Sequence, residues 1–169
     1  MNTGATTAWR TALFATCAPG WLILIRLLVG LVVFLPEGIQ KVVFPDILGA
    51  GRFLRIGIPY PDVMGPFVGV VEIVCGALII VGLFTRLAAI PLILIMIVAI
   101  VSTKIPILLG YDFWIFHVTK FPRYGFWSMA HEARADLCML LGALYLLIEG
   151  AGKWSLDALL SGHRSPHLD

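Results

Sequence analysis

Long apolar runs with almost no charge are the feature that most limits what this chain can fold into. Residues 87–101 contain no charged residue, residues 63–84 contain only Glu72, and residues 21–35 contain only Arg26. A helix of about 20 apolar residues spans the hydrocarbon core of a bilayer and satisfies its own backbone hydrogen bonds there. The sequence therefore predicts an integral membrane protein made of α-helices.

The composition excludes several other classes of protein. Hydrophobic residues make up 60% of the chain and charged residues 13%, against about 45–50% and about 25% in soluble domains. The net charge of +2, without a basic run, gives no indication of nucleic-acid binding. Three cysteines without a Cys-x-x-Cys spacing form neither a disulfide framework nor a zinc site. We therefore expect no nucleic-acid partner and no metal.

Turn residues divide the chain into four segments of transmembrane length. We expect an all-α membrane protein, a four-transmembrane-helix bundle, with helices at about 21–44, 62–84, 87–109 and 131–148. This membrane domain covers residues 21–160, between an N-terminal tail at 1–20 and a polar C-terminal tail at 161–169. Pro36 is expected to kink the first helix. The short joint of Thr85 and Arg86 makes the second and third helices antiparallel neighbours.

The loop between the third and fourth helices, residues 110–130, is rich in aromatic residues. Amphipathic rings prefer the headgroup region of a bilayer, so we expect this loop to lie at the membrane interface. The aromatic residues are Tyr111, Phe113, Trp114, Phe116, Phe121, Tyr124, Phe126 and Trp127.

Charged residues near the helix ends gather at one membrane surface. Successive helices cross in opposite directions; we name the surface at the start of the first helix side N and the opposite surface side F. Six charged residues that sum to zero fall at the side F ends, and a charge inside a bilayer is costly unless it has a partner. We therefore expect one connected network of Glu37, Lys41, Lys104, Glu132, Arg134 and Asp136.

Two charged residues lie deeper, Arg26 toward side N and Glu72 near the middle of the second helix. Their axial separation is under about 10 Å at 1.5 Å per residue, so the two side chains could reach each other. Gly65, Gly69 and Gly76 lie close to the Glu72 face and predict close approach of a neighbouring helix. Two interpretations stay open: ion pairs that lock the helices together, or a polar cavity open toward side F with Glu72 at its floor.

Several short motifs, in this order along residues 24–160, resemble those of the DoxX family of small prokaryotic membrane proteins. They are RLLVG at 26–30, EGIQK at 37–41, GIPYP at 57–61, EIVCGA at 72–77, GLFTR at 82–86 and GAGKWSLD at 150–157. The resemblance implies a four-helix bundle in the cytoplasmic membrane of a bacterium or archaeon, with both termini in the cytoplasm. It also implies a link to sulfur and thiol redox chemistry, because one branch of the family is the membrane subunit of a thiosulfate:quinone oxidoreductase. It carries over no catalytic residue.

These observations lead to competing functional hypotheses. The first is a redox-associated subunit that binds a quinone or a small sulfur compound in a polar intramembrane cavity. The oxygen atoms of that ligand would be bound by the cations Arg26, Lys41, Lys104 and Arg134, and Glu72 would relay a proton. The candidate cavity residues are Arg26, Glu37, Lys41, Glu72, Lys104, Glu132, Arg134 and Asp136. The second is a non-catalytic assembly subunit of a larger membrane complex, and the third a small transporter. Beside the lipid bilayer, we expect a protein partner or a homo-oligomer; the cofactor stays open, with a quinone as one candidate.

Overall fold

The first long helix is continuous from Gly20 to Val43 but changes its hydrogen-bond register midway. It consists of η1 (Gly20–Leu22), α2 (Ile23–Val32), the π-helical segment η2 (Val33–Ile39) and α3 (Gln40–Val43). Pro36 lies inside η2. Proline lacks an N–H group and its ring clashes with the carbonyl of residue i−4, so the helix widens there instead of continuing as a regular α-helix.

The second and third helices are antiparallel neighbours, as the sequence predicts. They are α5 (Pro61–Val81) and a composite helix of α6 (Thr85–Ala99), the π-helical η3 (Ile100–Lys104) and α7 (Ile105–Leu109). The turn between them requires glycine at position 82, where φ is +70° and a Cβ atom would lie 2.6 Å from Arg26 Cζ. The bounds of the first three helices differ from the expected ones by at most three residues.

The fourth long helix, α8 (Phe126–Glu149), begins five residues before the expected start at 131. Gly125, with φ +109°, ends the preceding loop, and its carbonyl accepts a hydrogen bond from Met129 N in the first helical turn. Phe126 and Trp127 therefore begin a helix, although their aromatic character is typical of the interfacial loop. Two short helices, α4 (Ala50–Arg55) and α9 (Leu156–Leu160), follow the first and fourth long helices.

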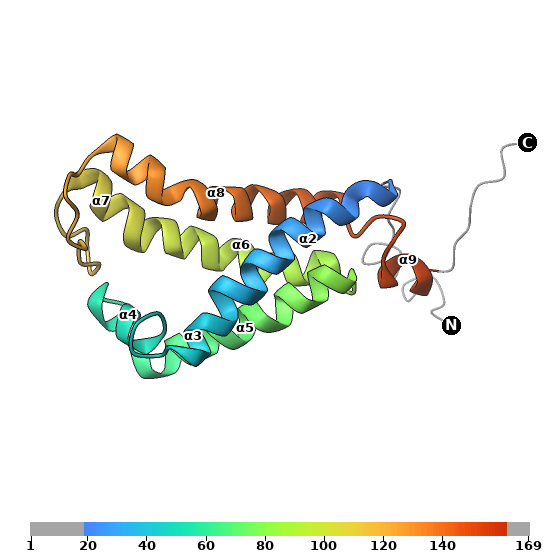
Figure 1. Ribbon diagram of the computed structural model, residues 1–169, viewed down its shortest axis with the longest axis horizontal. Helices are drawn as coiled ribbons and strands as arrows, with labels where there is room; N and C mark the ends of the chain where they lie inside the picture. The colour runs from blue at the N-terminus through green and yellow to red at the C-terminus, as the bar shows by residue number, and fades with distance from the viewer. Residues whose placement is uncertain (1–18, 162–169) are drawn as a thin grey trace, which may run out of the picture.

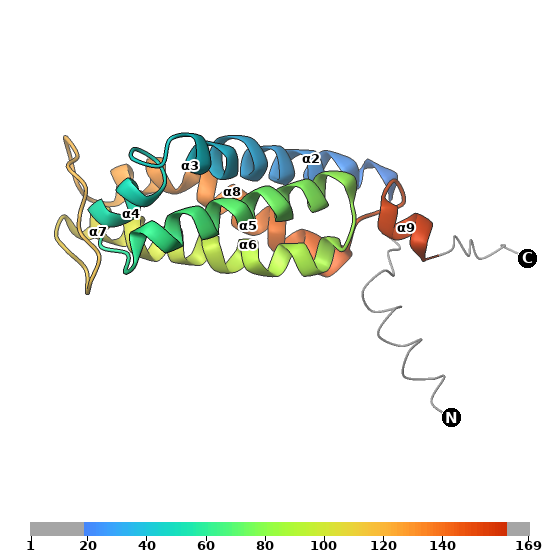
Figure 2. The same cartoon turned by 90° about the horizontal axis from the view of Figure 1, so that it is seen from below.

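Figures 1 and 2 show these elements as an elongated bundle, described over residues 19–161. The described part is all helical and contains no strand. Three of its helices, Gly20–Val43, Pro61–Val81 and Thr85–Leu109, are long and apolar enough to span a membrane. The expected tails, 1–20 and 161–169, lie almost entirely outside the described residues.

Glycine residues let the first helix and α5 pack backbone against backbone. A Cβ atom on Gly76 would lie 3.1 Å from the carbonyl oxygen of Gly30, and one on Gly38 would lie 2.9 Å from the backbone nitrogen of Ile73. Across the same interface, a Cβ atom on Gly69 would lie 3.4 Å from the Gly38 oxygen. The predicted close approach along the Glu72 face is thereby confirmed, and van der Waals contact between such small residues is one of the forces that hold helices together in lipid.

The outer surface of the bundle is apolar along its length. Large hydrophobic side chains are exposed on every long helix, including Leu24, Leu28, Val70, Leu94 and Leu141. A soluble monomer does not expose so much contiguous apolar surface, whereas lipid chains solvate it at no cost. The three helices that are long and apolar enough to span a membrane therefore contact the lipid bilayer.

The aromatic loop between α7 and α8 folds back on the loop that precedes α5. His117 N donates to the carbonyl of Ile56, and Asp112 accepts from Val118 N at 2.8 Å and contacts His117 Nδ1 at 2.9 Å. The hydrogen bond from Val118 N, followed by the one from His117, lowers the pKa of the Asp112 carboxyl group. These contacts give the loop a defined conformation at the side F end.

We expect Trp114 and Trp127 to lie at headgroup depth. Their side chains are 82% and 83% exposed in the isolated chain, and exposed indole rings partition to the interface. In nanodiscs, the fluorescence of single-tryptophan variants that keep Trp114 or Trp127 alone should be quenched most strongly by lipids brominated near the headgroup. Equal quenching of both by aqueous iodide, with none by brominated lipid, would show that the loop stands free in water.

Candidate functional site

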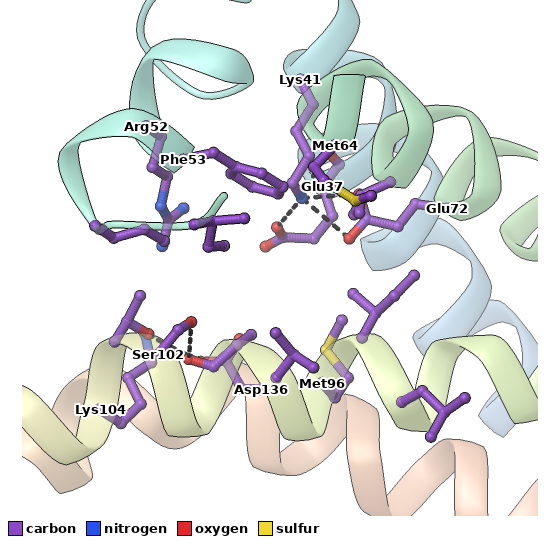
Figure 3. A pocket seen from close by; sticks show the side chains of 18 of the residues that line it. Glu37, Lys41, Arg52, Phe53, Met64, Glu72, Met96, Ser102, Lys104 and Asp136 are labelled. Atoms are coloured by element: carbon purple, nitrogen blue, oxygen red, sulfur yellow. Dashed lines mark hydrogen bonds and ion pairs between the residues drawn. The ribbon is translucent and has the colours of Figure 1, made fainter. Parts of the chain in front are cut away.

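A cavity of about 360 Å³ lies between two halves of the bundle toward side F. Figure 3 shows Glu37, Lys41, Arg52 and Glu72 on one side of it and Lys104 and Asp136 on the other. One wall is built by η2, α3, α4 and α5 and the other by α6, η3 and α8. Its volume falls in the range of small-molecule sites, about 300–1,000 Å³. Six of the eight candidate residues line it: Glu37, Lys41, Glu72, Lys104, Glu132 and Asp136.

On the first wall, one lysine holds two carboxylates. Lys41 Nζ lies 2.9 Å from Glu37 Oε2 and 3.0 and 2.8 Å from the two oxygens of Glu72. The Lys41 side chain is 8% exposed and that of Glu72 1%. A cation that is buried in this way is stable only if it is paired and hydrogen-bonded, and here all of its donors find oxygen atoms, the Glu37 carbonyl included. We name Glu37, Lys41 and Glu72 the acidic triad.

On the opposite wall, Lys104 Nζ pairs with Asp136 Oδ2 at 3.0 Å. Glu132 lies one turn away on α8, also lines the cavity, and is in no ion pair among residues 19–161. The expectation of one connected network is therefore wrong: the charges form two clusters that face each other across the cavity. Position in the sequence predicts that both clusters lie at the same end of the bundle. It does not predict the separation between α5 and α8, which depends on how the helices diverge.

Both π-helical segments border the cavity and set the positions of its charged groups. Glu37 lies in η2, and Lys104 is the last residue of η3. A π turn contains more residues than an α turn, so it shifts the direction of the side chains that follow it, and such turns are frequent at functional sites. Pro36 and Pro106 supply the local cause, since neither can donate the backbone hydrogen bond of a regular helix.

Arg26 lies outside the cavity, and the expected contact with Glu72 is wrong. Its guanidinium group donates to the carbonyl oxygens of Ile79 and Ile80 at 3.0 and 2.7 Å, and to those of Ala151 and Trp154. The last carbonyls of a helix have no partner within the helix. With five donors in a rigid plane, Arg26 satisfies the end of α5 and fixes the segment after α8 to it.

Asp157 lies at the same side N contact, where Arg26 joins the end of α5 to the segment after α8. The sequence did not single it out as a site residue. The carboxylate accepts from Phe84 N at 2.7 Å and from Thr85 N at 3.0 Å, at the N-terminus of α6. It is buried and interacts electrostatically with Arg26. An acidic residue within the last DoxX-like motif was the signal that could have indicated it.

Two arginines lie where the sequence did not predict them: Arg134 is outside the cavity and Arg52 lines it. Arg134 is exposed on α8 and donates to the carbonyl of His131, so its expected place in the cavity is wrong. Arg52, from the short helix α4, does line the cavity. The sequence offered no sign of this, because α4 belongs to a loop whose path only the tertiary structure decides.

The cavity combines these charges with a largely apolar lining. Four carboxylates face three cations, Lys41, Arg52 and Lys104, and most other lining residues are aliphatic, aromatic or Met. Such a site can hold an apolar body and donate hydrogen bonds to polar atoms at its ends. Among the cysteines of the described residues, Cys75 is buried and Cys138 is exposed; no metal-binding group of three or more His, Cys, Asp or Glu occurs there.

Comparison with known proteins identifies the family. The DoxX family model matches residues 21–105, half of the chain. The chain belongs to the DoxX family. It is also 52% identical over 162 residues to the uncharacterised membrane protein Rv3486 of Mycobacterium tuberculosis, covering 93% of this chain and 91% of that protein. No solved structure matches it. The DoxX match includes the acidic triad and Lys104, whereas Glu132 and Asp136 on α8 lie beyond it.

Proposed function

We propose that this DoxX-family protein crosses the cytoplasmic membrane of a prokaryote four times, with α8 as the fourth span. Support comes from its 24 residues, about 36 Å at 1.5 Å per residue, and from its packing beside α6. Charges in its first half do not oppose a membrane location, because Asp136 pairs with Lys104 and Glu132 faces the cavity. Arg134, close to the side F end, can extend to the headgroups.

We further propose that the cavity binds a quinone or a small sulfur compound, and that the protein is a redox-associated membrane subunit. One observation carries this proposal: lysine ammonium groups on opposite walls of a mainly apolar, intramembrane cavity. Carbonyl oxygens of a quinone, or oxygens of a sulfur oxyanion, accept hydrogen bonds from such groups. Charged side chains within a membrane bundle generally mark sites of function.

In this proposal the protein residues bind the head group and handle protons. Reduction of a quinone to a quinol consumes two electrons and two protons. Glu72 is placed to pass one proton from its carboxyl group to the nearer quinone oxygen, and Glu132 on the opposite wall to pass the second proton to the other oxygen. Glu37 can reload Glu72 with a proton from water at side F, since both contact Lys41. The electrons come from a redox protein that docks on this subunit.

Replacing Glu72 with glutamine is expected to weaken quinone binding at least tenfold while the protein still folds. The amide keeps the shape of the side chain but cannot ionise, and Lys41 keeps Glu37 as its counter-charge. Binding of a decyl-tailed benzoquinone to purified protein in nanodiscs, by equilibrium dialysis, measures the effect. Melting temperature is recorded on the same samples.

The matched control is Asp62→Asn, which removes an exposed carboxylate from the first turn of the same helix. Its quinone affinity should equal that of the wild type. Unchanged affinity in Glu72→Gln would contradict a role of the acidic triad in binding. Failure of the wild-type protein to bind the quinone, or to co-purify with one, would contradict the proposed function itself.

A partner-binding role is the second candidate, favoured by the aromatic surface at side F. Tyr111, Trp114, Phe126 and Trp127 are all exposed there, and aromatic residues are enriched where proteins bind each other. If this surface binds a partner or a second copy of the chain, gentle solubilisation should retain the complex on size-exclusion chromatography. Trp114→Ala together with Trp127→Ala should release it; an unaltered complex would rule out this surface.

A further inference from the structure

The cavity is bounded on one side by two lipid-facing helices that diverge. Figure 1 shows α5 and α6 together at their shared turn and apart toward side F. Counted from that turn, Val68 on α5 and Val98 on α6 stand at the same depth, and both line the cavity with Met64 and Leu94. The cavity therefore reaches the line along which α5 and α6 face each other, here named the α5–α6 seam, in the side F half of the membrane.

The residues at this seam are apolar and open to lipid. Leu94, Val98 and Met64 are 59%, 51% and 37% exposed although they line the cavity. Charged lining residues come from other elements, with the exception of Glu72, which is buried beneath the seam. An opening of this kind admits a lipid-soluble molecule without removing a charge from water, whereas an ion would lose its hydration there.

The charge of the cavity also selects among ligands. Carboxylates outnumber cations by one, Lys41 is shared between two of them, and Lys104 is paired with Asp136. A sulfur oxyanion would have to displace these carboxylates from the lysines that they pair with. A neutral head with carbonyl oxygens on two opposite edges can share the hydrogen bonds of Lys41 and Lys104 with the carboxylates that pair with them, and it adds no charge.

We infer that the ligand enters sideways from the bilayer through an apolar portal between α5 and α6, and is a quinone with a long apolar tail rather than a small sulfur anion. This inference rests on the proposed function and assigns its ligand class. The head lies between the acidic triad and the Lys104–Asp136 pair, and the tail leaves through the portal past Val68 and Val98.

A water-soluble ligand would need another route. A second cavity of about 330 Å³ adjoins the first, shares Arg52, Ile56, Thr103, Lys104 and Glu132 with it, and is also lined by residues of the loop before α8. Thiosulfate would enter through this side F cavity. Its entry would be insensitive to the size of residue 98 at the α5–α6 seam.

Obstructing the portal tests the inference. Val98→Trp should slow the association of a quinone with a long isoprenoid tail at least tenfold in nanodiscs, and Met64→Trp should act in the same direction. The control is Ile90→Trp, a substitution at an exposed residue of α6 that does not line the cavity. Association of thiosulfate is measured in parallel on all variants.

An independent measurement uses the wild-type protein, so its result does not depend on whether a variant folds. A benzoquinone with a photoreactive group at the end of its decyl tail should label peptides from α5 and α6, not those from α2 or the exposed face of α8. Labelling elsewhere, or unaltered association in Val98→Trp, would overturn the portal even if Glu72→Gln still weakens quinone binding. Failure of the wild-type protein to bind any quinone would instead refute the proposed function. High-affinity binding of thiosulfate instead of a quinone would refute the assignment of a quinone as the ligand.

Discussion

Replacing Lys41 with methionine should destabilise the protein by about 3–5 kcal/mol, which is typical for removing one partner of a buried ion pair. Methionine fills a similar volume but leaves Glu37 and Glu72 close together without a cation. Glu72, at 1% exposure, has no water to solvate its charge. The free energy of unfolding in mixed micelles, or the melting temperature in a fixed detergent, measures the effect.

Two further variants make this test specific. Lys120→Met removes an exposed lysine from the loop before α8 and should be nearly neutral. The double variant Lys41→Met with Glu72→Gln should be more stable than Lys41→Met alone, because it also removes the unpaired buried charge. Equal stability of the single and double variants would show that Lys41 and Glu72 are not coupled in the membrane.

Replacing Arg26 with methionine should have an effect of similar or larger size, at least about 3 kcal/mol, because several buried carbonyl groups lose their donor and each costs roughly 1–3 kcal/mol. These carbonyls belong to the end of α5 and to the segment after α8, which the guanidinium group holds together. Arg26→Lys should recover only part of the stability, since one ammonium group cannot match the planar set of five donors.

Arg26→Met also tests whether Arg26 supports the fold or contacts the ligand. Because Arg26 lies outside the cavity, Arg26→Met should retain quinone affinity in the fraction that stays folded. Arg134→Met, at the exposed arginine of α8, should change neither stability nor affinity. Selective loss of quinone binding in Arg26→Met at unchanged melting temperature would restore the sequence-based expectation of a ligand contact.

Charge patterning indicated the cavity because burial in lipid penalises every isolated charge. Glu72, Lys41 and Lys104 could be selected from the sequence alone, since their positions on apolar helices require partners. Counting residues along alternating helices also placed Lys104 and Asp136 at the same end of the bundle, where they pair. The sequence did not predict which charged residues pair, because Glu72 pairs with Lys41 and not with Arg26.

The sequence by itself determined that this is a helical membrane protein of the DoxX family, with close packing along the glycine face of α5. Hydrophobicity and small-residue spacing act locally, so they can be seen in the order of residues. Only the tertiary structure decided that Arg26 caps α5, that Arg52 reaches the cavity from a loop helix, and that the charges divide into two facing clusters. Arg26 contacts Ile79 and Ala151, which are 53 and 125 positions away in the sequence. These outcomes therefore depend on packing between segments that the order of residues alone does not bring together.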